Sequence, residues 1–78
     1  MTDVHVPEDL WSTAMAPEGV IERWRRAEGD VAAAGTAVAA VRIEGALHEL
    51  IAPAGGRLTI LAGPNAVVEP GSVIDRID

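Results

Sequence analysis

The sequence contains no cysteine and no lysine among its 78 residues. Without cysteine, the chain can form no disulfide, no thiolate nucleophile and no cysteine-based zinc site. Its basic residues are all arginines: Arg23, Arg25, Arg26, Arg42, Arg57 and Arg76. Because a guanidinium group keeps its proton and its charge in proteins, arginine cannot replace lysine as an acyl acceptor. The α-amino group of Met1 is therefore the one primary amine in the sequence.

Other absences narrow the class of protein further. The formal charge of −6 and the lack of a basic stripe with interleaved aromatics argue against nucleic-acid binding. The longest apolar stretch, residues 31–41, is interrupted by Gly35 and Thr36 and falls short of the ~20 residues that span a bilayer. No basic region precedes an apolar one at the amino terminus, as a signal peptide would require. We expect one domain over residues 1–78, without membrane contact and located in the cytoplasm.

Short apolar runs separated by glycine and proline predict strands. The organising stretch is residues 41–56, V-R-I-E-G-A-L-H-E-L-I-A-P-A-G-G, which predicts a hairpin turning at Glu44-Gly45. An edge strand is expected before Pro7, and residues 8–17 are expected to form a loop anchored by Trp11 and Met15. The remaining expected extended segments are residues 19–24, 31–35, 37–43, 46–52, 56–61, 67–68 and 73–77.

Helix propensity favours another structure for residues 17–26, where Val20, Ile21 and Trp24 have helical spacing. An internal repeat decides against it. Five residues recur 36 positions later as Val67, Gly71, Ser72, Ile74 and Ile77, the first copy being Val31, Gly35, Thr36, Val38 and Val41. At an offset of 37, the residues Gly19, Ile21 and Trp24 recur as Gly56, Leu58 and Leu61. The second copy is strand-like throughout, so we predict strands in the first and two halves related by a pseudo-dyad.

Several segments in this order resemble the biotinyl/lipoyl carrier domain. They are V-H-V-P-E-D, P-E-G-V-I-E-R-W, E-G-D-V, A-P-A-G-G and V-V-E-P-G-S-V-I. The match is closest to lipoyl domains of 2-oxo acid dehydrogenase acyltransferases. The resemblance implies an all-β flattened barrel or sandwich of two four-stranded antiparallel sheets. It also implies that both termini lie at one end and the carrier hairpin at the other.

The resemblance places the modified lysine eight residues before the proline of the Ala-Pro corner. Eight residues before Pro53 is Gly45, flanked by Glu44 and Ala46. The lipoyl signature Asp-Lys-Ala thus becomes Glu-Gly-Ala, and both methionines of the biotinyl signature Met-Lys-Met are replaced. Glycine has no side chain to acylate, so we expect neither lipoate nor biotin on this chain. We also expect no other cofactor and no metal.

Two functions remain open. The first is a lipoyl/biotinyl-like domain that carries no cofactor and acts as a protein-interaction or structural module. The second is a carrier domain of a 2-oxo acid dehydrogenase or biotin-dependent carboxylase system whose acceptor lysine has been lost or mutated. In both, the partner is a protein, such as a subunit of a dehydrogenase or carboxylase complex. An enzyme in its own right is not indicated, since the sequence shows no nucleophile–base pair.

The candidate residues for partner recognition are Glu8, Asp9, Trp11, Glu44 and His48. Lipoyl domains imply a recognition role for the loop after the first strand, and an exposed Trp11 would mark that face. His48 with Glu49 and Glu44 would also suit a metal or acid–base site, but alternation along a solvent-facing strand explains them more simply. Trp24 is expected in the core.

The arginine cluster near Trp24 consists of Arg23, Arg25 and Arg26 and is expected to be a solvated face. Its charges would be balanced by Glu22, Glu28 and Asp30.

Overall fold

The computed structural model describes residues 1–12, 14–15 and 17–78 and has eight strands in that part of the chain. The strands are β1 (Thr2–His5), β2 (Gly19–Trp24), β3 (Val31–Ala32), β4 (Ala37–Ile43), β5 (Ala46–Ile51), β6 (Gly56–Ile60), β7 (Val67–Val68) and β8 (Val73–Ile77). One 3₁₀ turn, η1 (Glu8–Trp11), follows β1. β2 confirms the strand predicted from the repeat and rules out the helical alternative.

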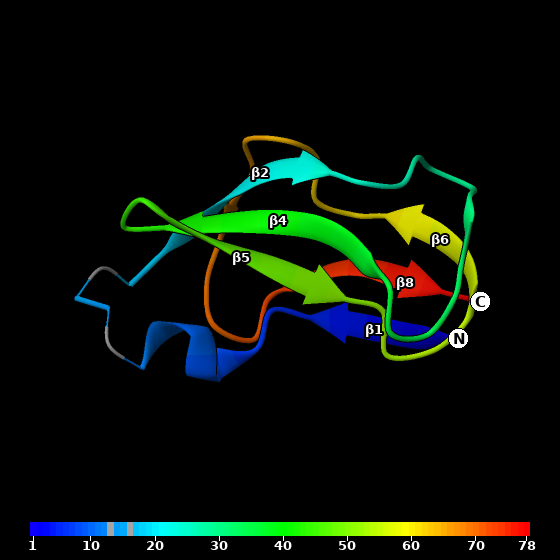
Figure 1. The fold of residues 1–78 in the computed structure, drawn as a ribbon, viewed down its shortest axis with the longest axis horizontal. Helices are drawn as coiled ribbons and strands as arrows, with labels where there is room; N and C mark the ends of the chain where they lie inside the picture. The colour runs from blue at the N-terminus through cyan, green and yellow to red at the C-terminus, as the bar shows by residue number, and fades with distance from the viewer. Residues whose placement is uncertain (13, 16) are drawn as a thin grey trace.

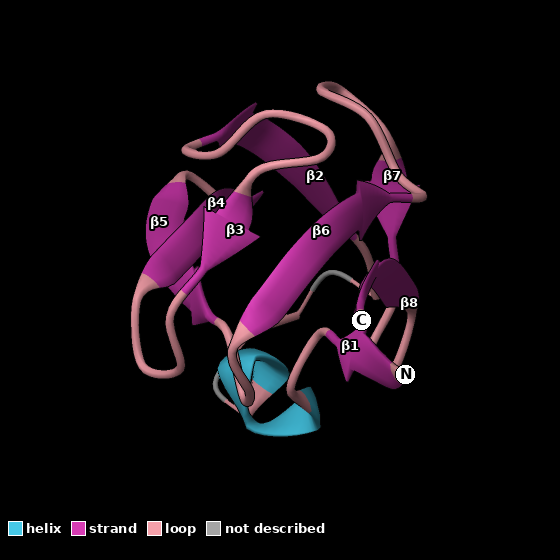
Figure 2. Ribbon diagram, turned by 90° about the vertical axis from the view of Figure 1, so that its right-hand side faces the viewer, coloured by secondary structure: helices cyan, strands magenta, loops and turns pink. Residues whose placement is uncertain are grey.

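The strands form two antiparallel four-stranded sheets, one with the order β1-β8-β6-β3 and the other with the order β5-β4-β2-β7. The molecule is flattened and elongated, measuring 34 × 20 × 16 Å. The sheets do not close on each other, so the sandwich form of the prediction is correct and a closed barrel is not. Figure 2 shows the strands from the end of the molecule that holds the termini, with η1 below them.

The topology has the predicted pseudo-symmetry. Exchanging β1 with β5, β2 with β6, β3 with β7 and β4 with β8 converts the strand order of one sheet into that of the other. Equivalent hydrogen bonds also occur in both halves: Gly29 N donates to Leu58 O, and Asn65 N donates to Ile21 O, both at 2.8 Å. Gly29 and Asn65 both have positive φ, +86° and +70°, which glycine and asparagine adopt at the lowest cost. The repeat in sequence is therefore a repeat in backbone geometry.

Pseudo-symmetry also explains where the ends of the chain lie. The hairpin joins β4 to β5, and its dyad-related counterpart would join β8 to β1, where the chain instead begins and ends. The termini and the hairpin tip therefore lie at opposite ends of the sandwich, as predicted (Figure 1).

The core fills the space between the sheets with aliphatic side chains. Its fully buried members include Val6, Ile21, Val38, Val41, Leu50, Leu58, Ile74 and Ile77. Burying such a side chain contributes roughly 1.5–3 kcal/mol, and with no disulfide this core supplies most of the stability. Trp24 is half-buried against it and donates from Nε1 to Ala62 O at 2.8 Å.

One charged side chain lies inside this core. Asp75 of β8 is fully buried, and neither carboxylate oxygen has a hydrogen-bond partner among the described residues. Its cross-strand neighbours are Val4 on β1 and Ile60 on β6. Cross-strand neighbours project from the same face of a sheet, so Asp75 points into the apolar interior.

Several predicted contacts differ in the structure. Met15 is 93% exposed and is no anchor, whereas Trp11 is buried in the core cluster. Residues 8–17 begin with η1 and are not entirely loop; Thr13 and Ala16 of this segment lie outside the described residues. Arg25, directly after β2, forms an ion pair with Glu49 on β5 instead of with its neighbours in sequence.

The other charges near Trp24 also have partners that the sequence does not predict. Arg42 pairs with Glu22 at 2.8 Å. Glu28 accepts from Ile60 N at 2.7 Å, and Asp30 accepts from Ala27 N at 2.9 Å. These carboxylates hold backbone in place and do not balance the arginine cluster.

Candidate functional site

The hairpin tip is a two-residue loop between β4 and β5. Glu44 and Gly45 have φ values of +51° and +84°, the pair of left-handed residues that a type I′ turn requires. A side chain at Gly45 would meet no heavy atom within 4 Å. The position predicted for the acceptor is therefore exposed and sterically open, and only backbone strain opposes a larger residue there.

Glu44 ties this tip to the segment that follows η1. Its Oε2 accepts a hydrogen bond from Met15 N at 3.0 Å. Glutamate at positive φ is strained, at a cost of about 1 kcal/mol, and this hydrogen bond offsets part of that cost. Glu44 thus holds backbone of the neighbouring segment.

Removing this carboxylate should loosen the segment without unfolding the protein. In Glu44→Ala we expect faster hydrogen exchange at the Met15 amide, with a loss of less than about 1 kcal/mol in the free energy of unfolding. Glu18→Ala, an exposed carboxylate on the same segment, is the matched control. Equal Met15 exchange in both variants, measured by NMR, would contradict the role assigned to Glu44.

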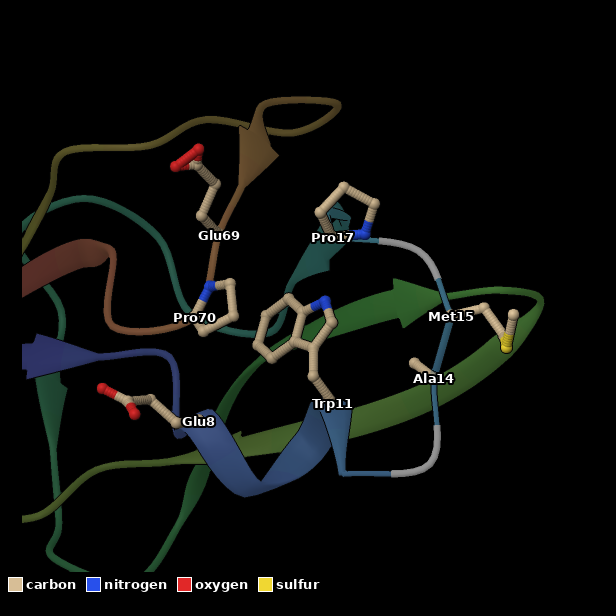
Figure 3. Close-up of a pocket in the computed structure, with 7 residues that line it drawn as sticks. All are labelled: Glu8, Trp11, Ala14, Met15, Pro17, Glu69 and Pro70. Atoms are coloured by element: carbon tan, nitrogen blue, oxygen red, sulfur yellow. The ribbon is translucent and has the colours of Figure 1, made fainter.

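A pocket of about 610 Å³ opens at this end of the molecule. It is lined by Glu8, Trp11, Ala14, Met15, Pro17, Glu69 and Pro70. Figure 3 shows the Trp11 ring between Pro70 and Pro17, with the carboxylates of Glu8 and Glu69 on the side away from Met15. The pocket thus has an apolar base and an acidic side.

Backbone hydrogen bonds bring the two acidic segments together although they are far apart in sequence. Val6 N donates to Ser72 O and Gly71 N donates to Val6 O, both at 2.9 Å. His5 Nδ1 lies 3.0 Å from Gly71 O, which fixes the exposed edge strand β1 to the same turn. A Cβ at Gly71 would lie 3.6 Å from Oε2 of Glu8. Glu8 is thereby held against the turn that carries Glu69 and Pro70.

Trp11 has an unusual environment for a buried indole. It is only 9% exposed, and its Nε1 has no hydrogen-bond partner among the described residues. A buried donor without an acceptor costs about 1–3 kcal/mol. Trp24, by contrast, has an acceptor in Ala62 O. Trp11 is thus the core anchor that the sequence predicted, and it is not the exposed aromatic that would have marked a recognition face.

The structure brings some of the predicted recognition residues together. Glu8 and Trp11 line the pocket, and Glu44 joins its Met15 side through the hydrogen bond described above. Asp9 is exposed on η1 and does not line the pocket. His48 lies on β5 opposite the buried Val41, so it is half-buried on the inner face of that strand.

Sequence reasoning missed Glu69, Pro70 and Pro17 as pocket residues. Glu69-Pro70 lies in a segment that the sequence marks as a turn, but nothing local indicates that it meets Glu8. The one available signal was the repeat, which makes the turns at Gly35 and Gly71 equivalent. Gly35 N donates to Ala52 O after β5, and Gly71 N donates to Val6 O after β1, so the two turns make equivalent contacts.

The side chains of His48 and Glu49 lie on opposite faces of β5, because the two are consecutive residues of the strand. Glu49 accepts a hydrogen bond from Arg25 Nε at 2.9 Å. This hydrogen bond lowers the pKa of Glu49 and keeps the carboxylate ionised. Within the described ranges, no group of three or more histidine, cysteine, aspartate or glutamate residues could hold a metal ion.

The fold and this end together define a small all-β sandwich with an acidic, partly apolar pocket beside its hairpin tip. Protein-family models and curated proteins were both searched, and neither comparison gave a match to the chain. Over the part of the chain that the structure describes, no helix has the length and apolar character needed to cross a membrane.

Proposed function

We propose that the chain is a lipoyl/biotinyl-like domain without covalent cofactor, which works as a non-catalytic protein-interaction module. The observation that carries the proposal is the combination of a carrier-like hairpin with Gly45 at its tip and no lysine in the sequence. A carrier needs a neutral primary amine at this position to form an amide with an activated acyl group. Glycine supplies none, and Met1 lies at the opposite end of the molecule (Figure 1).

Two further features support a binding role over a carrier role. A swinging cofactor arm needs a tip that is free to enter partner active sites, whereas Glu44 is hydrogen-bonded to the segment beside it. The pocket next to that segment also offers an apolar base and carboxylates, which are the elements of a recognition surface. The lipoate and biotin chemistry of carrier domains therefore does not fit the residues present.

The alternative is a carrier domain of a 2-oxo acid dehydrogenase or biotin-dependent carboxylase system that has lost only its lysine. The observation in its favour is the open surroundings of Gly45, with an acidic residue retained before it as in the lipoyl signature. The two functions differ in whether a ligase would still recognise a restored acceptor.

Restoring the lysine as Gly45→Lys tests this difference. The variant should fold with a loss of about 1 kcal/mol, because a non-glycine residue at φ +84° is strained but meets no neighbour. Incubated with lipoate ligase or biotin ligase and activated cofactor, it should keep its unmodified intact mass, while an authentic carrier domain in the same reaction is modified. A lipoyl or biotinyl mass increase on the folded variant would instead support the carrier alternative.

A further inference from the structure

We propose that the pocket lined by Trp11, Met15, Pro17 and Pro70 binds a partner segment through a basic side chain, arginine in preference to lysine, flanked by apolar residues. This inference rests on the proposed function of the domain as an interaction module and names the chemistry of the partner. It places the cation between Glu8 and Glu69 and the apolar flanks over the indole and the Met15 side chain (Figure 3).

The first argument is the segregation of charge along the chain. Residues 7–18, 44–46 and 63–72, which build this end, contain five carboxylates and none of the six arginines. The carboxylates are Glu8, Asp9, Glu18, Glu44 and Glu69. Charges of one sign gathered around a recess attract a ligand of the opposite sign and speed its association.

The second argument is that the pocket carboxylates Glu8 and Glu69 form no ion pair with any described residue. The ion pairs among the described residues join Arg25 to Glu49, Arg42 to Glu22 and Arg76 to Asp3, and none reaches Glu8 or Glu69. Holding Glu8 against the turn that carries Glu69 brings two like charges to one side of the pocket. A bound cation would supply these carboxylates with a partner of opposite charge.

The third argument comes from Trp11. Its indole is about nine-tenths buried, its Nε1 lacks an acceptor, and Figure 3 shows that nitrogen turned toward the Pro17 side of the pocket. A backbone carbonyl of an entering segment would supply the missing acceptor. Because Met15 is 93% exposed at this rim, its side chain is available to cover the apolar part of the ligand.

Arginine fits these features better than lysine. A planar guanidinium can lie on an aromatic or proline surface and donate to two carboxylates at once, whereas an ammonium is a compact, strongly hydrated charge.

The test is a titration of the full chain, followed by NMR, with acetyl-Ala-Leu-Arg-Leu-Ala-amide and with the same peptide carrying lysine or glutamine in place of arginine. We expect the arginine peptide to shift the Trp11 indole and the Met15 and Gly71 amides while leaving the Trp24 indole unchanged. The lysine peptide should bind more weakly and the glutamine peptide at least about fivefold more weakly. Raising the salt from about 20 mM to about 200 mM should weaken the arginine peptide further.

Variants assign the effect to the pocket. Glu8→Gln and Glu69→Gln should each weaken the arginine peptide by about threefold to tenfold. Asp78→Asn makes the same charge change on an exposed residue at the opposite end and should leave the affinity unchanged. Equal affinity for the arginine and glutamine peptides, no binding of the arginine peptide, or an equal effect of Asp78→Asn would each overturn the proposal.

These outcomes are separable from a failure of the proposed function. A ligase that modifies Gly45→Lys would overturn the interaction-module function without changing any peptide affinity. A flat titration alongside an unmodified Gly45→Lys would overturn only the pocket as the binding site.

Discussion

Replacing Gly56 with alanine should lower the free energy of unfolding by about 3 kcal/mol or more. Gly56 begins β6 with φ at +152°, a conformation that L side chains rarely adopt. An added Cβ would lie 2.1 Å from the carbonyl oxygen of Asp78 and 2.8 Å from Cγ2 of Ile77. Asp78 cannot move away freely, because its backbone exchanges two hydrogen bonds with Arg57, at 2.9 and 3.0 Å.

The adjacent Gly55 provides the control for this prediction. A Cβ there would meet Ala32 O at 3.5 Å, an ordinary contact, and its φ lies outside the positive range. Gly55→Ala should therefore change stability by less than about 0.5 kcal/mol. Urea unfolding of both variants measures the difference, and similar midpoints for the two would mean that the clash at Gly56 is relieved by movement of the last residues.

Replacing Asp75 with asparagine should stabilise the protein near neutral pH and remove a pH dependence. Burial raises the pKa of the Asp75 carboxyl from its ordinary value of 3.8 to about 6. The folded state therefore holds its proton more tightly than the unfolded state does. The resulting stability is fully present below pH 3.8 and is lost as the pH rises through about 6.

The size of this effect follows from the shift, since each pKa unit corresponds to about 1.4 kcal/mol. Near pH 7 the wild-type protein should be less stable than Asp75→Asn by up to about 3 kcal/mol, whereas near pH 4 the difference should be small. Chemical unfolding of both proteins between pH 4 and pH 7 measures this difference. The contributions of the other carboxylates cancel in it, because both proteins contain them. A difference that stays constant over this range would contradict the titration of a buried Asp75.

The fold was largely predictable because the sequence contains two copies of the same strand and turn pattern. Residues 56–77 carry proline and glycine at positions that suit strands and turns but interrupt a helix. The repeat relates them to residues 19–41, so the same strands are predicted there although part of that segment has helix propensity. Gly35 and Gly71, 36 positions apart, have φ values of +87° and +86°. One physical requirement, a left-handed turn residue before β4 and before β8, explains both glycines.

Asp75 shows where pattern reading fails. Between Ile74 and Arg76 an aspartate is typical of a solvent-facing strand position, yet its register with Val4 and Ile60 places it inside. The repeat is consistent with this burial, because the residue 36 positions before Asp75 is Ala39, which is fully buried. The second half thus keeps a carboxyl where the first half has a methyl group.

The candidate site was predictable only in part, for reasons of tertiary structure. The hairpin turn at Glu44-Gly45 was predicted correctly, because turn geometry and sequence spacing are local. The pocket depends on pairing between β1 and β8 at opposite ends of the chain, which brings Glu8 to Glu69. Met15 looked like an anchor on hydrophobicity alone, but at 93% exposure it lies on the rim.

The most direct test of the central claim is the intact mass of the native chain. The protein should be produced in cells that make lipoate and biotin ligases, then incubated with each ligase and its activated cofactor. With no lysine and Gly45 at the hairpin tip, we predict the mass of the unmodified polypeptide in every sample, while an authentic carrier domain treated in parallel gains its cofactor. A lipoyl or biotinyl mass increase on the native chain would contradict the account.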